Sequence, residues 1–411
     1  MKIAVWHNLP SGGGKRALYY HVKGLVEKGH KVESWCPPTA DQSFMSSLSD
    51  IAPEHVVPFV WEPVRSVNPV VMCSNFLKKI KAMDKHCKMC AQEINSGGFD
   101  ILFANSCTFF RSAPIGRYVD LPKVLYLQEP YRWIYEALPE LPWPALPDPV
   151  TLREFLIYPF IFMRDLGRVQ LLRVQAREEI TNAKAFDMIL VNSLFSRESV
   201  LRAYGIDSKV CYLGVDTDFF KPIKMDKERF VVGLGGIYFG KGIESSIRAI
   251  AAIPEDKRPE IIWVGNFSDA KYQREMENLA NASGVKISFR IRASQEEVLD
   301  ILNRAAVMIY TPRLEPLGLA PLEANACGTP VVAIAEGGVR ETVKDGVNGF
   351  LVNNDDPVLL GQAVLRVLED GALLQQMSRR CREHVLSNWT WSASVDCLEK
   401  NFSDVLKMRG R

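Results

Sequence analysis

The chain has 411 residues, of which 47% are hydrophobic and 24% are charged, which is the composition of a soluble globular protein. This length exceeds what one hydrophobic core usually organises, so we expect two or three domains. The formal net charge is +2, which supplies no overall positive field and argues against a nucleic-acid-binding protein.

The N-terminal segment predicts a βαβ unit. Ile3–Trp6 is a short apolar strand, and Gly12–Gly14 interrupt the chain after it. Residues 15–28 place apolar side chains along one helical stripe, and Gly29 follows that helix at the position of a C-terminal glycine. Lys31–Trp35 then begins a second strand. Two short strands joined by a helix favour a parallel sheet.

The same alternation continues along the chain. Further strands are expected at Asp100–Ala104, Lys123–Leu127, Met188–Asn192, Phe230–Leu234, Glu260–Gly265, Lys286–Phe289, Val307–Thr311 and Pro330–Ile334. Helices are expected at residues 241–252, 270–283, 295–304 and 358–369. The proline-rich residues 128–180 predict an insertion with one or two helices. So many βα units predict two doubly wound α/β domains.

The expected domain boundary lies between Ala203 and Arg229, where the polar stretch Lys221–Arg229 precedes a new strand. We assign residues 1–205 to the first domain, 206–387 to the second and 388–411 to a closing helical segment. The longest apolar run, Phe155–Met163, is about half of the roughly 20 residues that a membrane-spanning helix needs. No secretory signal is recognised, so a cytoplasmic location is expected.

The nine cysteines are scattered over most of the chain, as expected for reduced and mostly buried thiols. Cys87 and Cys90, preceded by His86, raise the question of a zinc or redox pair. No second pair follows at the spacing of a zinc finger, which favours two thiols on one helix face.

Two carboxylates stand eight residues apart around Gly318. Glu315 is expected in a loop after the strand Val307–Thr311, and Glu323 inside a helix. Gly318 lets backbone N–H groups approach an anion at the start of that helix. Alternatively, Glu315 caps the helix and Glu323 is an ordinary exposed helix residue.

A glycine-rich turn follows the strand Phe230–Leu234. Gly235 and Gly236 lead to Lys241, and the helix begins there. A glycine turn at a helix N-terminus with a lysine beside it can cradle an anion, although the pattern is not a Walker loop. A plain βα turn is the alternative. Together with the two carboxylates, the turn suits a diphosphate flanked by sugar hydroxyls.

These elements resemble the retaining glycosyltransferases of family 4. The matching motifs are Gly235…Lys241-Gly242, Glu315-x7-Glu323, Gly328–Ala333, Gly337–Glu341, Asp345–Val352, the linker-like Gly214–Phe220, Gly12–Gly14 and Gly29–Val32. The resemblance covers nearly the whole chain, is most specific at residues 310–352 and is weak at residues 40–180.

The resemblance implies the GT-B architecture, which has two Rossmann-like domains with an interdomain cleft. Residues 388–411 would pack back on the first domain. The implied activity moves a sugar, with retention, from a nucleotide-diphosphate sugar (UDP rather than GDP) to a glycan, lipid-linked or small-molecule acceptor. No metal or other cofactor is implied. A sugar phosphorylase or synthase of the same fold, and a non-catalytic nucleotide-sugar binder, are the alternatives.

The resemblance also assigns roles to single residues. Lys241 would neutralise the donor diphosphate, Glu315 would hold a hydroxyl of the transferred sugar, and Glu323 would bind the ribose. The donor-binding set is Gly12, Gly13, Gly14, Gly235, Gly236, Arg292, Gly318, Leu319 and Glu323. The segment Phe289–Ala293 would lie against the nucleobase.

The sequence departs from the family pattern at two places. Gly236 stands where the family usually has an arginine, and Arg313 or Arg292 is a candidate to replace its charge. Near Glu129, many relatives carry a histidine that touches the donor sugar, and Glu129 or Arg132 is a candidate for that place.

Two segments have the character of a peripheral membrane surface. Residues 76–90 combine an apolar stripe with several lysines, and residues 155–168 join an apolar run to arginines. A basic amphipathic helix can lie on anionic lipid, in which case the acceptor would be lipid-linked. The other interpretation is an ordinary solvated helix that packs its apolar face on the sheet.

Overall fold

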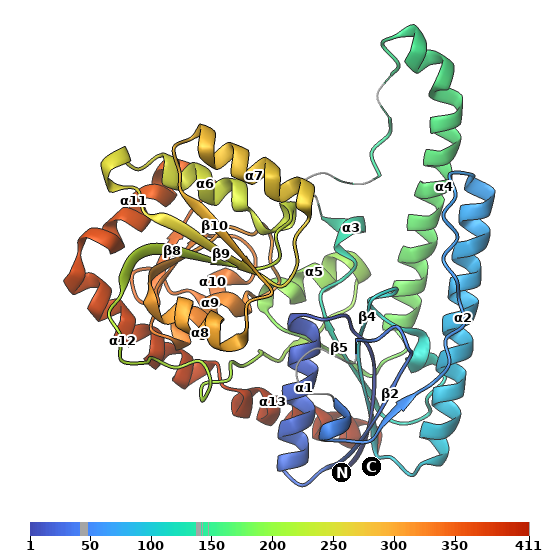
Figure 1. Cartoon of the computed structure of the whole chain (residues 1–411). Helices are drawn as coiled ribbons and strands as arrows, with labels where there is room; N and C mark the ends of the chain where they lie inside the picture. The colour runs from blue at the N-terminus through green and yellow to red at the C-terminus, as the bar shows by residue number, and fades with distance from the viewer. Residues whose placement is uncertain (42–47, 137–140, 142, 147, 411) are drawn as a thin grey trace. The chain divides into compact units, whose positions relative to one another are not determined.

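A computed structural model of the chain describes residues 1–41, 48–136, 141, 143–146 and 148–410 (Figure 1). The chain forms two compact units. The first unit comprises Met1–Asn192, Arg197–Cys211 and Val395–Arg411, and the second unit comprises Ser193–Ser196 and Tyr212–Ser394. Each unit has its own parallel sheet and its own hydrophobic core.

The first unit is built on a seven-stranded sheet in the order β3-β2-β1-β4-β5-β6-β7. Its strands are β1 (Lys2–Asn8), β2 (Lys31–Cys36), β3 (Glu54–Val56), β4 (Ile101–Cys107), β5 (Lys123–Gln128), β6 (Met188–Val191) and β7 (Lys209–Val210). Its helices are α1 (Gly13–Glu27), α2 (Pro69–Ser96), α3 (Arg132–Tyr135), α4 (Leu152–Ala183), α5 (Leu194–Tyr204) and, from the end of the chain, α13 (Trp391–Met408). All strand pairs are parallel.

Alternate strand residues of the first unit pack against different helices. Trp6 and Leu125 belong to a core cluster that includes buried residues of α2 and α5. On the opposite face, the ring of Phe103 lies 5.2 Å from that of Phe402 in α13. This period of two is expected for strands that are covered on both faces.

His21 lies in α1 within this core, and its side chain is fully buried. Burial lowers the pKa of His21 to about 3, whereas a histidine in the unfolded protein has a pKa near 6.5. As the pH falls, His21 is therefore protonated in the unfolded protein before it is protonated in the folded protein. Protonation stabilises the unfolded state, so the free energy of unfolding decreases as the pH falls below about 6.5.

We expect the wild-type protein to lose on the order of 2 kcal/mol more unfolding free energy than a His21→Gln variant between about pH 7 and about pH 5. Urea unfolding followed by circular dichroism at each pH measures this difference. Parallel pH profiles of the two proteins would contradict the assigned pKa.

The second unit is built on a six-stranded sheet in the order β10-β9-β8-β11-β12-β13. Its strands are β8 (Glu228–Leu234), β9 (Glu260–Gly265), β10 (Ile287–Ile291), β11 (Ala305–Tyr310), β12 (Val331–Ile334) and β13 (Gly349–Val352). Its helices are α6 (Ile243–Ala251), α7 (Ala270–Ala282), α8 (Gln295–Arg304), α9 (Leu319–Ala326), α10 (Val339–Thr342), α11 (Pro357–Glu369) and α12 (Gly371–Asn388). Val231, Trp263 and Ile309 share one core cluster with α6, α7 and α11.

The two predicted doubly wound α/β domains are confirmed, and all the predicted strands are present with shifts of a few residues at their ends. Three strands were not predicted, namely β3, β7 and β13. The helix expected from residue 241 begins only at Ile243, because Phe239–Lys241 form a 3₁₀ turn.

Cys87 and Cys90 are buried on one helix, as the simpler interpretation predicted. In the part of the chain that the structure describes, no helix combines the length and the apolar character needed to cross a membrane.

Candidate functional site

The strand order of the second unit defines a topological switch point between β8 and β11. The chain runs from β8 outward to β10, then returns to the other side of β8 with β11. At such a point the loops after two neighbouring strands leave in opposite directions, and a crevice opens at the carboxyl ends of the strands. Lys241 follows β8 and Glu315 follows β11. The structure therefore brings the two residues to the position where doubly wound sheets bind ligands.

Lys241 and Glu315 form a direct ion pair. The Nζ atom of Lys241 donates to both carboxylate oxygens of Glu315, at 3.0 and 3.1 Å. Their side chains are 18% and 23% exposed, so the pair is half-buried and still reachable from solvent. The aliphatic part of Lys241 passes over Gly235, where an added Cβ would lie 3.2 Å from Cδ of the lysine. A fixed ammonium group at this place can attract an anionic group of a ligand.

A glycine contact holds the lysine loop against the end of β11. Gly242 adopts φ 66°, and a Cβ at this position would collide with the carbonyl oxygen of Thr311. The Thr311 hydroxyl donates to the carbonyl oxygen of Gly242 at 2.7 Å. Only glycine satisfies both the left-handed conformation and the close approach. The position of Lys241 is thereby tied to the strand that precedes Glu315.

A second pair of glycines fixes the backbone of Glu315. The N–H of Gly338 donates to the carbonyl oxygen of Glu315 at 2.8 Å. A Cβ on Gly338 would collide with the carbonyl oxygen of Pro316, and one on Gly337 would collide with the backbone of Glu315. The loop after β12 therefore packs closely against the loop that contains Glu315.

Glu323 lies inside α9, and its residue is only 5% exposed. The alternative of an exposed helix glutamate is thus wrong, because burial of a carboxylate requires partners or a ligand. Gly318 precedes α9 with φ 91°. No side chain among the described residues caps this helix, and Leu319 supplies its first amide. A helix start of this kind, with its uncapped N–H groups, favours an anion.

The position of Gly236 has a structural explanation. A Cβ there would collide with the ring of Phe267, which stacks on Tyr238 at a centroid distance of 5.5 Å. Phe267 thus occupies the space into which a side chain at residue 236 would extend. Arg313 makes two hydrogen bonds to Glu336, at 2.6 and 2.7 Å. This carboxylate already engages Arg313, which was a candidate to replace the missing charge.

Arg292, the other candidate, follows β10 with a positive φ of 59° and is exposed. Its N–H donates to the carbonyl oxygen of Gly265 at the end of β9. A Cβ on Gly265 would in turn approach the carbonyl oxygen of Gly235 at 2.7 Å. The ends of β8, β9 and β10 are therefore joined by backbone contacts. Arg292 follows β10 and Glu315 follows β11, so β9 and β8 lie between the two strands that they follow.

The remaining candidate residues lie in the first unit. Gly12 precedes α1 with φ 135°, Gly13 begins this helix, and a Cβ on Gly14 would lie 3.2 Å from the amide of Gln128. The glycine loop therefore lies beside the segment that follows β5. Glu129 in this segment pairs with Arg111 at 3.2 Å and with Arg132 at 3.6 Å. Glu129 and Arg132 thus form one charged group next to the glycine loop.

A second group of side chains, which was not predicted from the sequence, lies near the end of β1, at the end of β2 and at the start of β3. Ligand atoms of His7, Cys36 and Glu54 lie within 4.8 Å of one another, a set that could hold a metal ion. His7 Nε2 donates to Glu54 at 2.9 Å, and burial lowers the pKa of His7 to about 4. The ammonium of Lys15 lies 3.9 Å from Glu54 and already supplies a positive charge to this carboxylate. The group was missed because β3 has no apolar pattern and because His7 lies in β1 just beyond the predicted strand Ile3–Trp6.

Comparison with known proteins finds one matching family model and curated relatives over about half of the chain. Residues 215–384 match the family model described as glycosyl transferases group 1. The chain is 28% identical over 237 residues to D-inositol 3-phosphate glycosyltransferase 1 of Catenulispora acidiphila. This alignment covers 52% of this chain and 56% of the relative. It is 31% identical over 232 residues to D-inositol 3-phosphate glycosyltransferase of Xylanimonas cellulosilytica, and this alignment covers 51% of this chain and 53% of the relative. The chain thus spans about half the length of the curated relatives it matches.

Solved structures resemble the chain over almost its full length. Sucrose-phosphate synthase from Thermosynechococcus elongatus matches with a TM-score of 0.73 and 18% identity, covering 99% of this chain and 100% of that one. HepE of Anabaena, solved with UDP and glucose, matches with a TM-score of 0.69 and 18% identity, covering 98% and 100%. At these identities the likeness concerns the fold alone, which is GT-B.

Proposed function

We propose that this protein transfers a sugar from a nucleotide-diphosphate sugar to an acceptor, as the match of residues 215–384 to the model of glycosyl transferases group 1 supports. The observation that carries the proposal is the ion pair of Lys241 and Glu315 at the switch point between β8 and β11. The proposed donor is a UDP-sugar and the proposed outcome is retention of the anomeric configuration. The acceptor is a glycan, a lipid-linked sugar or a small molecule.

The chemistry of the transfer defines what the site must do. Cleavage of the bond between the anomeric carbon and the phosphate oxygen leaves an oxocarbenium-like sugar and a nucleoside diphosphate anion. A fixed cation and oriented amides that stabilise this anion lower the barrier. Lys241 supplies the cation, and the N–H groups that follow Gly318 supply the amides. The departing phosphate oxygen accepts the proton of the acceptor hydroxyl, so no separate side-chain base is needed.

The two carboxylates have different tasks in this proposal. Glu323, buried in α9, accepts hydrogen bonds from the ribose hydroxyls, which a desolvated carboxylate does strongly. Glu315 accepts a hydrogen bond from a hydroxyl of the transferred sugar, and the diphosphate competes with this carboxylate for the ammonium of Lys241. The diphosphate lies between them, beside the lysine.

The proposal is tested with the purified full chain and a panel of UDP- and GDP-hexoses. We expect slow release of the nucleoside diphosphate without an acceptor, unchanged by EDTA because no metal enters the proposed chemistry. Acceleration by inorganic phosphate or a sugar phosphate would instead indicate a phosphorylase or a synthase. Tight donor binding in calorimetry without any release would indicate a binding protein. Absence of both binding and release for every donor would refute the proposal.

The contact between Gly236 and Phe267 gives a separate prediction. Gly236→Arg alone should increase donor turnover less than it does in the Phe267→Ala background, since the new side chain must first displace the ring of Phe267. The double variant Gly236→Arg/Phe267→Ala should turn over the donor about tenfold faster than Phe267→Ala, because a second cation then reaches the diphosphate. Rates of nucleoside diphosphate release measure both effects. Equal rates in the double variant and in Phe267→Ala would show that residue 236 does not face the diphosphate.

A further inference from the structure

The N-terminal part of α4 extends beyond the other long helix of the first unit (Figure 1). Pro69, the first residue of α2, lies against Gly167 of α4, where an added Cβ would be 2.6 Å from Cβ of the proline. Residues 152–166 therefore continue past the start of α2, over roughly 22 Å at 1.5 Å per residue. We call these residues the α4 extension.

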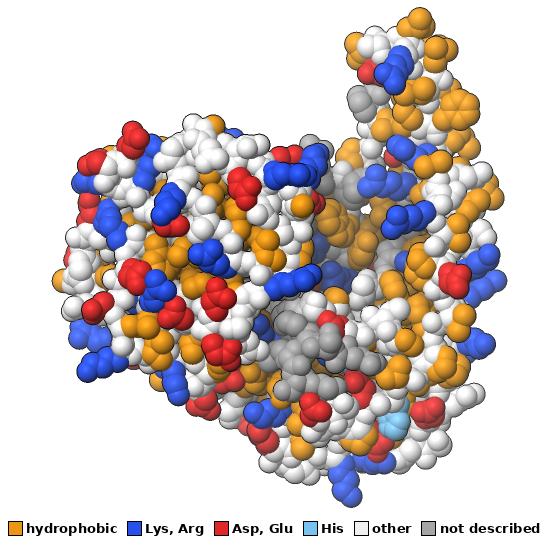
Figure 2. Space-filling model, in the orientation of Figure 1, with side chains coloured by type: hydrophobic (Ala, Val, Ile, Leu, Met, Phe, Trp, Pro, Cys, Tyr) orange, Lys and Arg blue, Asp and Glu red, His pale blue; other side chains and the backbone are white. Residues whose placement is uncertain are grey.

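The α4 extension is apolar and exposed. Leu152, Phe155, Leu156, Phe160 and Met163 are 77%, 66%, 65%, 79% and 54% exposed. Figure 2 shows apolar side chains covering much of this projecting part, with basic side chains among them. A soluble protein rarely leaves so many large apolar residues together on its surface, and such a patch marks an interaction site.

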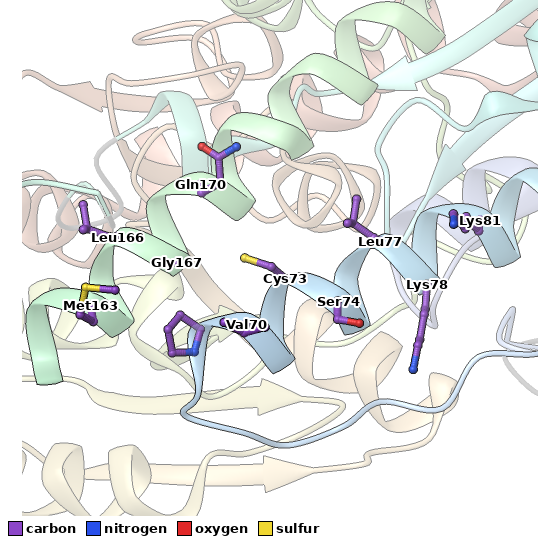
Figure 3. Close-up of a pocket in the computed structure, with 11 residues that line it drawn as sticks. Val70, Cys73, Ser74, Leu77, Lys78, Lys81, Met163, Leu166, Gly167 and Gln170 are labelled. Carbon is purple, nitrogen blue, oxygen red and sulfur yellow. The ribbon is translucent and has the colours of Figure 1, made fainter.

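A groove continues the apolar surface between α4 and α2 (Figure 3). Its volume is about 700 Å³, and Met163 and Leu166 of α4 line it together with Val70, Cys73 and Leu77 of α2. Lys78 and Lys81 of α2 also belong to its lining. The groove therefore has the chemistry of an apolar chain next to an anionic group.

Charge around this surface is strongly positive. The exposed cations of α4 up to residue 173 and of the first half of α2 are Lys78, Lys81, Arg153, Arg164, Arg168 and Arg173. Only Glu154 and Asp165 carry negative charge in the same segments, and Glu154 is engaged in the capping box of α4 with Thr151. Such an excess of cations around an apolar patch complements an anionic partner.

The charges of the α4 extension are also confined to one side of the helix. At 3.6 residues per turn, Arg153, Glu154, Arg164 and Asp165 of the extension and Arg168 just after it fall within a sector of roughly 120°. Phe155, Phe160 and Met163 fall outside it, and Met163 also lines the groove. Ile157 and Ile161 share the charged sector, so the helix is apolar over most of its surface and charged on one side only. A helix with its charges on one side can lie in a membrane interface.

We propose that the α4 extension and the adjoining part of α2 dock the protein on an anionic phospholipid bilayer. The apolar side of the helix enters the acyl-chain region of one leaflet, and the lysines and arginines contact lipid phosphates. A second copy of this chain is the other possible occupant, but a symmetric contact would bring the same cations of both copies together. The inference is independent of the proposed catalysis, because lipid binding requires neither donor nor acceptor.

Co-sedimentation of the full chain with vesicles tests the inference. We expect binding to vesicles of phosphatidylcholine with phosphatidylglycerol and much weaker binding to phosphatidylcholine alone. Phe160→Ser should lower the partition coefficient about tenfold, and Phe155→Ser/Phe160→Ser about a hundredfold, since each phenylalanine leaves the acyl-chain region. Arg164→Gln should lower it about fivefold, and added salt should reduce this difference.

The matched control is Leu386→Ser, which removes a 48% exposed leucine from α12 in the second unit and should leave vesicle binding unchanged. The phenylalanines are mostly exposed, so their serine variants should keep the wild-type thermal transition, which circular dichroism verifies. Equal binding to neutral and anionic vesicles, or equal binding of wild type and double variant, would overturn the inference. So would a wild-type dimer in light scattering that Phe155→Ser/Phe160→Ser dissociates while neither protein binds vesicles.

Discussion

Replacing Lys241 by alanine is expected to lower kcat/KM for the nucleotide sugar by about a thousandfold. In the proposed reaction, negative charge grows on the diphosphate as the bond to the sugar breaks, and Lys241 supplies the fixed positive charge beside it. Removal of one such stabilising group in other enzymes slows the reaction by about a hundredfold to a thousandfold. Release of nucleoside diphosphate from the donor measures the effect.

The matched control is Lys271→Ala in the same unit. Lys271 is 84% exposed and pairs with Glu275 one helical turn away at 3.7 Å, so its removal should leave the rate unchanged. Lys241→Arg keeps the charge but presents a planar, larger group, and we expect it to recover only part of the activity. A wild-type rate in Lys241→Ala, with a wild-type thermal transition, would remove Lys241 from the reaction.

The strands of both sheets could be predicted because parallel strands are buried on both faces. All six residues of β11 are buried, and its sequence is a continuous apolar run. The strands that were missed lack this signal. β3 contains Glu54 and His55 within three residues, and β7 has only two residues. Their strand conformation depends on pairing with β2 and β6, which no local pattern reports.

For the candidate site, the sequence predicted where Lys241 and Glu315 lie along the chain but not how their side chains are arranged. The order of strands indicated that Lys241 and Glu315 follow β8 and β11, yet their direct ion pair depends on loop conformations. Those conformations are set by contacts of Gly242 with Thr311 and of Gly338 with Pro316, between loops that follow different strands. The same reason explains why the obstruction of Gly236 by Phe267 could not be anticipated. A glycine in a turn is common in many structures, so Gly236 alone does not indicate a neighbouring ring. Phe267 belongs to another loop, and the local sequence around Gly236 does not report this contact.

The ion pair raises the question of what Glu315 does, and Glu315→Gln separates two answers. If Glu315 contacts the transferred sugar, turnover of the nucleotide sugar should fall about a hundredfold. Binding of the nucleoside diphosphate alone should persist and become about threefold tighter, because the carboxylate no longer competes with phosphate for the ammonium of Lys241. Calorimetry with the nucleoside diphosphate and kinetics with the full donor measure the two quantities independently.

If Glu315 serves only to position Lys241, the variant should lose turnover and diphosphate affinity together, as Lys241→Ala does. The double variant Lys241→Ala/Glu315→Gln adds a further criterion. Two residues that act as one unit give non-additive losses, so the double variant should then be no slower than Lys241→Ala. Glu369→Gln is the matched control, since it removes a carboxylate from an exposed ion pair with Lys257 at 2.7 Å in the same unit. Tighter diphosphate binding in Glu315→Gln alone, with slow turnover, would assign the carboxylate to the sugar and the ammonium to the phosphates.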